Sequence, residues 1–133
     1  MTDDNLEAAV DLWCVDEAQA RATYGDIATW DTSQVTDMKG LMSPHYQNRE
    51  YSWNARPHMQ TCNPEIGSWD TGAVTTMDAM FYYANSFNRD LSWDVSSVET
   101  MMSMFVGASS FSATLALSKC AMYSRLSPSS MRP

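Results

Sequence analysis

The side chains best suited to contact a ligand are concentrated in one short stretch, residues 43–61. This stretch carries both histidines of the chain together with aromatic and arginine residues: His45, Tyr46, Arg49, Tyr51, Trp53, Arg56 and His58. Exposed aromatic and Arg side chains on a loop are the residue types that dominate binding energy at interfaces. Tyr82 and Tyr83 occupy the matching loop of a later segment and extend the same candidate surface. The candidate ligand-binding residues are therefore His45, Tyr46, Tyr51, Trp53, Arg56, His58, Tyr82 and Tyr83. A purely structural loop and a metal site at the two histidines are the alternatives.

A second candidate is a column of carboxylates formed by Asp31, Asp70 and Asp94, each of which directly follows a tryptophan. If these three residues stack, their like charges repel one another by about 1 kcal/mol per adjacent pair even at the dielectric constant of water. Backbone N–H donors at a turn would offset this repulsion. A bound calcium ion is the alternative, because carboxylates at close range are its usual ligands. The loop spacing of an EF-hand is absent, and we assign no cofactor.

Catalytic patterns are missing from the sequence. There is no Gly-x-Ser-x-Gly motif, no glycine-rich phosphate loop, and neither His45 nor His58 has a recognisable Ser or Cys partner. We therefore predict that the chain is not an enzyme.

The elements that must position these side chains belong to a repeat. The segment occurs three times, as WDTSQVTDM at 30–38, WDTGAVTTM at 69–77 and WDVSSVETM at 93–101. Self-similarity at periods of roughly 20–50 residues marks stacked-repeat architectures. The first two copies are further apart than the last two because residues 43–61 form an inserted loop. Insertions of this kind fall on one face of a repeat array.

Within each copy the sequence predicts a short extended piece, a turn at the Asp and a short helix. The apolar residues of that helix recur at i, i+3, i+6 and i+7, which is helical spacing. They are Val35, Met38, Leu41 and Met42, then Val74, Met77, Met80 and Phe81, then Val98, Met101, Met104 and Phe105. The three tryptophans, Trp30, Trp69 and Trp93, are expected to stack as a buried ladder, and ligand recognition by them is the alternative.

The two ends of the chain differ from the repeat. Residues 4–21 read as one helix, with Leu6, Ala9, Val10 and Trp13 on one face. Such a helix would cover the open end of the stack, which terminal units of repeat proteins must do. We predict a capping helix at 1–23, three repeats at 24–115 and an irregular tail at 116–133. A tail without a cap would allow self-association through that end.

Composition narrows the partners and the compartment. The net charge is −8, and all sixteen acidic residues lie at or before Glu99. Nucleic acids and anionic membranes both require a basic footprint, so neither is an expected partner. No apolar run approaches the roughly 18 residues of a membrane span, and no signal peptide is visible. The three cysteines, Cys14, Cys62 and Cys120, form no recognisable pattern, and we expect buried or free thiols.

Four motifs carry a family resemblance: YGDI at 24–27, WDTS at 30–33, VTDM at 35–38 and FNRDLS at 87–92. Together they resemble the repeat of the BspA-like leucine-rich-repeat surface proteins. The resemblance implies a right-handed solenoid of short strands and short helices, and a cell-surface or secreted protein used in adhesion. The expected fold is an α/β, short, right-handed leucine-rich-repeat-like solenoid with an N-terminal capping helix. The expected function is non-catalytic recognition of a protein or a surface glycan. A structural module of a larger surface protein and a calcium-dependent binding module are the alternatives.

Overall fold

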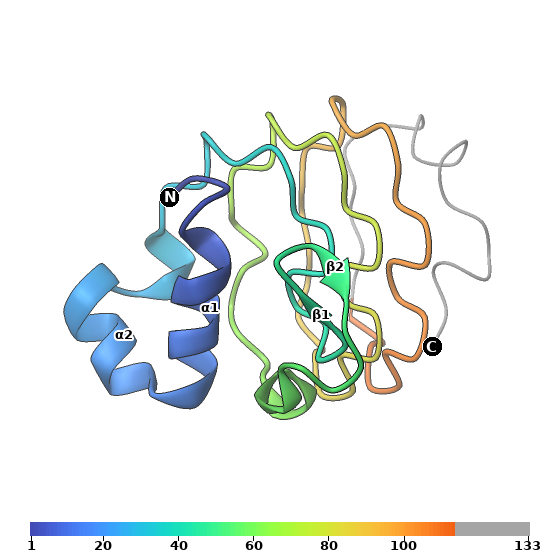
Figure 1. Cartoon of the computed structure of the whole chain (residues 1–133). Coiled ribbons are helices and arrows are strands. Elements are labelled where there is room, and N and C mark those ends of the chain that lie inside the picture. Colours follow the sequence, from blue (N-terminus) through green and yellow to red (C-terminus); the bar gives the residue numbers. More distant parts are fainter. Residues whose placement is uncertain (114–133) are drawn as a thin grey trace.

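The computed structural model describes residues 1–113 (Figure 1). Its helices are α1 (Leu6–Val15), α2 (Glu17–Tyr24) and two 3-10 helices, η1 (Ile27–Thr29) and η2 (Pro57–Thr61). Its strands, β1 (Tyr46–Gln47) and β2 (Glu50–Tyr51), form an antiparallel hairpin. The expected irregular tail at 116–133, its self-association and Cys120 all fall outside the described residues.

The three copies of the repeat lie side by side in the register of the sequence. Asp37 pairs in parallel with Thr76, and Thr76 pairs in parallel with Thr100. These offsets, 39 and 24 residues, equal the spacings between successive repeat tryptophans. Alternate backbone N–H groups of one copy donate to carbonyls of the next at 2.8–3.0 Å, the donors being Met38, Gly40, Met42, Met77, Ala79, Phe81 and Tyr83. Figure 1 shows the resulting row of parallel chain segments.

The short helix predicted in each copy is wrong. The backbone instead forms successive turns, in which the N–H groups of Met80, Tyr82 and Ala84 each bond to the carbonyl three residues earlier. Ala79 and Tyr83 have φ angles of +53° and +59°, which a right-handed helix does not allow. Residues i and i+3 lie on the same side of the chain both in these turns and in a helix. The spacing of the apolar residues is therefore compatible with either structure. The turns leave alternate N–H groups free to bond to the neighbouring copy.

The expected burial of the three repeat tryptophans is confirmed, and stacking is observed for the first pair. Trp30, Trp69 and Trp93 are all buried, and the rings of Trp30 and Trp69 stack with centroids 6.3 Å apart. Each indole N–H also finds a backbone carbonyl, since Trp69 donates to Ile27 at 2.8 Å and Trp93 to Ile66 at 3.1 Å. These two bonds reach from one copy into the preceding one, whereas the Trp30 indole donates to Gly25 in its own copy at 3.1 Å. Trp69 and Trp93 therefore both fill the core and fix the register.

The N-terminal segment covers one end of the repeat, as expected, but as two helices and not one. The chain bends at Asp16, whose side chain caps α2 by accepting a bond from the N–H of Gln19 at 3.1 Å. The apolar face of α1 is buried, and its Trp13 meets Trp30 edge to face with centroids 6.0 Å apart. The helix therefore extends the ladder of indoles by one ring.

Asp3 completes this cover with hydrogen bonds. In the second and third copies, the N–H groups of Thr75 and Glu99 donate to the preceding copy. The first copy has no preceding copy, and its equivalent donor, the N–H of Thr36, bonds to the Asp3 carboxylate at 2.8 Å. The Asp3 carboxylate also accepts from the Thr36 hydroxyl and the Asp37 N–H. A side chain thus replaces the missing carbonyls at the end of the repeat.

The expectation of free thiols is wrong for two of the three cysteines. Cys14 at the end of α1 forms a disulfide with Cys62, which directly follows η2. The two residues are 48 positions apart in the sequence, and only the packing of α1 against the end of the insert brings them together. The bond joins the N-terminal helices to the inserted segment.

Candidate functional site

The inserted segment, residues 43–61, leaves the first copy and returns through the β1–β2 hairpin and η2. Asn48 and Arg49, the two residues between the strands, have φ angles of +52° and +64°. Positive φ at both central residues is the geometry of the tight hairpin turn that fits the twist of the strands. The hairpin sets Tyr46 opposite Tyr51, and their rings meet edge to face at 5.7 Å.

Six of the eight candidate residues come together in one cluster, which we call the aromatic surface. Its members are His45, Tyr46, Tyr51, Trp53, Tyr82 and Tyr83. Tyr82 joins the two segments, because its ring lies 6.0 Å from that of Tyr46 and 6.5 Å from that of Tyr51. His45 joins them a second time, 6.2 Å from Tyr82 and 5.4 Å from Tyr83. Residues some 30 positions apart in sequence therefore form a continuous set of rings.

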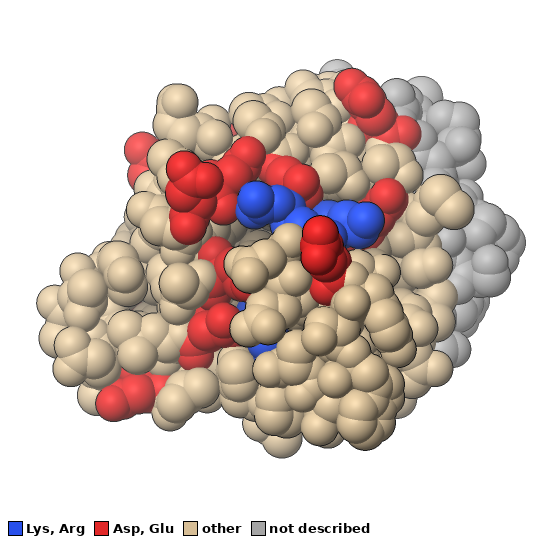
Figure 2. Space-filling view, in the orientation of Figure 1, with Lys and Arg blue, Asp and Glu red and all other residues tan. Residues whose placement is uncertain are grey.

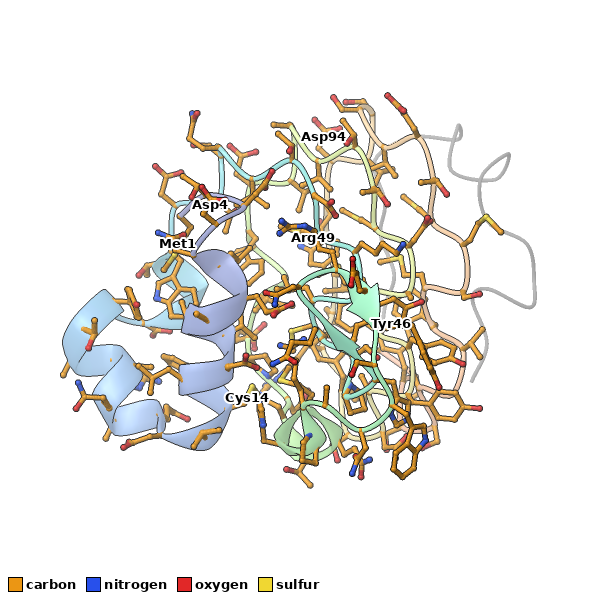
Figure 3. All side chains as sticks on the ribbon, in the orientation of Figure 1. Met1, Asp4, Cys14, Tyr46, Arg49 and Asp94 are labelled. Atoms are coloured by element: carbon orange, nitrogen blue, oxygen red, sulfur yellow. A yellow bond between two sulfur atoms is a disulfide. The ribbon has the colours of Figure 1, made fainter. Side chains whose placement is uncertain are left out.

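The aromatic surface faces solvent. Trp53 is 72% exposed, Tyr51 59% and Tyr83 41%, while the other three members are half-buried beneath them. Figure 2 shows a broad area without charged side chains below and beside the hairpin, and Figure 3 labels Tyr46 at that hairpin. Single exposed apolar residues are ordinary, but a contiguous exposed apolar patch usually marks an interaction site.

Two glycines leave room for the tyrosines of this surface. A Cβ on Gly40 would lie 2.4 Å from the Cβ of Tyr46, and a Cβ on Gly107 would lie 2.5 Å from the ring of Tyr83. Both glycines also have positive φ, at +65° and +74°. The sequence did not lead us to predict a role for either glycine. Gly107 occupies the position in the third copy that Tyr83 holds in the second.

The hydrogen-bonding roles of the polar atoms in the aromatic surface can be assigned. The Nδ1 atom of His45 accepts a bond from the N–H of Asn54 at 3.0 Å, so in the neutral imidazole Nε2 carries the proton and can donate. Burial, with smaller contributions from Tyr82, Asp78 and Tyr51, raises the pKa of Tyr46. Burial likewise raises the pKa of Tyr82. An ordinary tyrosine is protonated at neutral pH, and the raised pKa values keep both O–H donors in place to still higher pH.

Arg56 is wrong as a ligand contact, because it is only 1% exposed. Its guanidinium Nε donates to Asp11 at 2.8 Å, and its terminal nitrogens donate to four backbone carbonyls, those of Gly40, Leu41, Ser43 and Tyr46. A planar group with five donors suits such a site, which a lysine could not fill. Arg56 binds the insert to α1 and to the first copy, and so holds the aromatic surface in place.

His58 also lies apart from the aromatic surface. Its Nε2 atom is 2.7 Å from the same Asp11 carboxylate that pairs with Arg56. Glu7, one turn earlier on α1, accepts a bond from the N–H of Asn48 at 3.0 Å. Acidic residues of α1 thus serve as acceptors for the insert, and His58 belongs to this attachment.

The aspartate column has local partners. Asp31, Asp70 and Asp94 each accept a bond at 2.9–3.0 Å from the backbone N–H two residues ahead. Asp31 also accepts from the hydroxyl of Ser33, and this bond is the main reason that its pKa is lowered. Figure 3 places Asp94 at the upper edge of the coils, away from Tyr46. The three carboxylates close the turns that follow the tryptophans.

Among residues 1–113, no group of three or more His, Cys, Asp or Glu side chains could hold a metal ion. No helix in that range is long and apolar enough to cross a bilayer.

The chain was compared with protein families, curated proteins and solved structures. Neither the curated proteins nor the solved structures gave a match. One family model matches residues 14–125, which include the end of α1, the insert and all three copies of the repeat. The match spans well over half of the sequence, and the chain therefore belongs to the family described as "Mycoplasma protein of unknown function, DUF285".

Proposed function

We propose that this chain is a non-catalytic recognition module that binds its ligand through the aromatic surface. The observation that carries the proposal is the convergence of six aromatic rings from two separate loops onto one solvent-facing patch. Keeping a Trp ring 72% exposed gains little for folding, because its apolar area stays in water. Rigid aromatic side chains supply large contact areas at low entropic cost when a ligand binds.

We further propose the fold class of the BspA-like leucine-rich-repeat proteins, a short right-handed solenoid. The parallel pairing of Asp37, Thr76 and Thr100 supports stacking of the copies. The family match supports a relationship at the level of the domain. Such arrays hold variable loops on a rigid support, and here the insert is the largest of those loops.

The disulfide supports a cell-surface or secreted location. Disulfide bonds persist in oxidising compartments and are rare where thiols are kept reduced. The bond between Cys14 and Cys62 connects the two elements that frame the insert. An adhesion role at a surface is consistent with this chemistry.

The test is binding by the whole chain to two sets of probes, an oligosaccharide array and a panel of purified extracellular-matrix proteins. Wild type is compared with the double variant Trp53→Ala/Tyr83→Ala, and Val15→Ala is the matched control. Val15 is 66% exposed and lies on α1, outside the aromatic surface. We expect at least one probe to bind wild type and the control, and to lose about tenfold or more in affinity with the double variant. Binding that is equal in all three proteins would refute the proposal.

A further inference from the structure

We propose that the ligand of the aromatic surface is an uncharged glycan, whose sugar rings stack on Trp53 and its neighbours. This inference rests on the function proposed above and names its ligand class. It follows from the chemistry of the rings, from their stacking geometry and from the charges around them.

The aromatic surface contains only rings that carry a polar group, and no phenylalanine. All six rings of the aromatic surface carry an N–H or O–H group, and they are four Tyr, one His and one Trp. In contrast, Phe81, Phe87 and Phe105 are fully buried, and Phe111 packs against the core. No Phe therefore belongs to the exposed patch. A pyranose ring has an apolar C–H face and a rim of hydroxyl groups, and it needs both an aromatic face and nearby polar atoms. Protein interfaces are also enriched in Phe, Met and Arg, and none of these belongs to the aromatic surface.

Trp53 has the geometry of a stacking platform. Its ring lies parallel to that of His45, with an interplanar angle of 9° and centroids 5.8 Å apart. His45 supports one face of the indole, and the large exposure of Trp53 leaves the other face to solvent. His45 in turn lies 5.4 Å from Tyr83. The indole is thus held flat before any ligand arrives, which lowers the entropic cost of binding.

Hydrogen-bonding groups stand close to this platform. The Nε2–H of His45 is set to donate by the bond that Nδ1 accepts from Asn54. The Tyr46 and Tyr82 phenols are protonated at neutral pH, as an ordinary tyrosine is, and burial raises the pKa of each further. Each of these groups can pair with sugar hydroxyls, which both donate and accept.

Charge favours a neutral sugar over an acidic one. The chain carries a net charge of −8, and no member of the aromatic surface is a Lys or Arg. Asp78 acts electrostatically on Tyr46, and Glu50 lies in the hairpin strand β2. The nearby guanidinium groups of Arg49 and Arg56 are each already paired with a carboxylate. A sialylated or sulfated glycan would meet repulsion here and find no cationic partner within the patch.

The experiment uses an array that pairs each neutral oligosaccharide with its sialylated or sulfated form, probed with the whole oxidised chain. We expect binding to one or more neutral members, and at least about tenfold weaker binding to the matched acidic member. Trp53→Ala should lose about tenfold or more in affinity, Trp53→Phe should retain part of it, and Val15→Ala should be unchanged. Thermal melting checks that each variant is folded.

The outcomes separate the two proposals. Binding of matrix proteins but of no glycan, with loss in Trp53→Ala, would overturn the glycan inference and leave the recognition function standing. Preference for the acidic member of each pair would also overturn the inference. Glycan binding that is unaffected by Trp53→Ala would refute both proposals, because the ligand would then lie elsewhere on the chain.

Discussion

Breaking the bond between Cys14 and Cys62 tests how firmly the N-terminal helices and the insert are joined. The bond closes a loop with a sequence separation of 48 residues. In the chain-entropy model, closing a loop of this length lowers the entropy of the unfolded chain by an amount worth about 4 kcal/mol at 25 °C. For a chain of 133 residues we expect the loss of the bond to lower the melting midpoint by about 10–20 °C.

The assay is thermal and urea unfolding in a Cys120→Ala background, which removes the third thiol. The oxidised protein is compared with the reduced protein and with Cys14→Ala/Cys62→Ala. Without reductant, the denatured background protein should expose no free thiol, and after reduction it should expose two. Equal midpoints for the oxidised and reduced forms, or two free thiols before reduction, would refute the reasoning.

Three other perturbations address the attachment of the insert, the exposure of the aromatic surface and the capping carboxylate. Arg56→Met should lower the free energy of unfolding by about 3–5 kcal/mol in urea titrations, because it leaves buried carbonyls and Asp11 without their donor. Arg89→Met breaks an exposed pair with Glu65 and one bond to the Asn63 carbonyl, and it should cost only about 1 kcal/mol. Equal costs for the two variants would contradict the account. Acrylamide should quench mainly Trp53, since the other four indoles are buried, and Trp53→Phe should remove most of the quenchable fluorescence. The pKa of Asp3 is lowered because bonds from Thr36 and Asp37 and the charge of Arg49 together outweigh the opposing effect of burial. The ionised Asp3 therefore stabilises the fold above its ordinary pKa, and this stabilisation disappears as pH falls through the lowered value. Stability curves of wild type and Asp3→Asn should differ at neutral pH and converge in acid, and a constant gap would be the contrary result.

The register in which the copies stack was predictable, because equivalent positions of the three copies can be aligned in the sequence. Trp30, Trp69 and Trp93 recur with the same neighbours, so burying one indole implies burying all three. The turn-closing role of the aspartates was predictable for the same reason. The local conformation after each Val was not, since residues such as Met77 and Met80 satisfy helical spacing while the backbone makes turns. The bonds that decide between the two come from the neighbouring copy, which no local pattern reveals.

The candidate site was predictable in composition but not in detail. His45, Trp53 and Tyr83 were identified from their residue types, and the fold brings them together. Arg56 is also a residue type that is common at binding hot spots. Its side chain is nevertheless buried and pairs with Asp11, which lies 45 positions away in the sequence. The Cys14–Cys62 bond likewise depends on contact between α1 and the end of the insert. Long-range contacts of this kind determined both of these features, which the sequence left open.

The central claim is that the insert and the second copy of the repeat form a single aromatic surface. Nuclear Overhauser spectra of the intact oxidised chain test this claim most directly. The account predicts cross-peaks between the rings of Tyr46 and Tyr82, and between those of His45 and Tyr83, whose centroids lie 6.0 and 5.4 Å apart. Rings of residues 45–53 that show no contact with Tyr82 or Tyr83, and that have the shifts of a free loop, would contradict it.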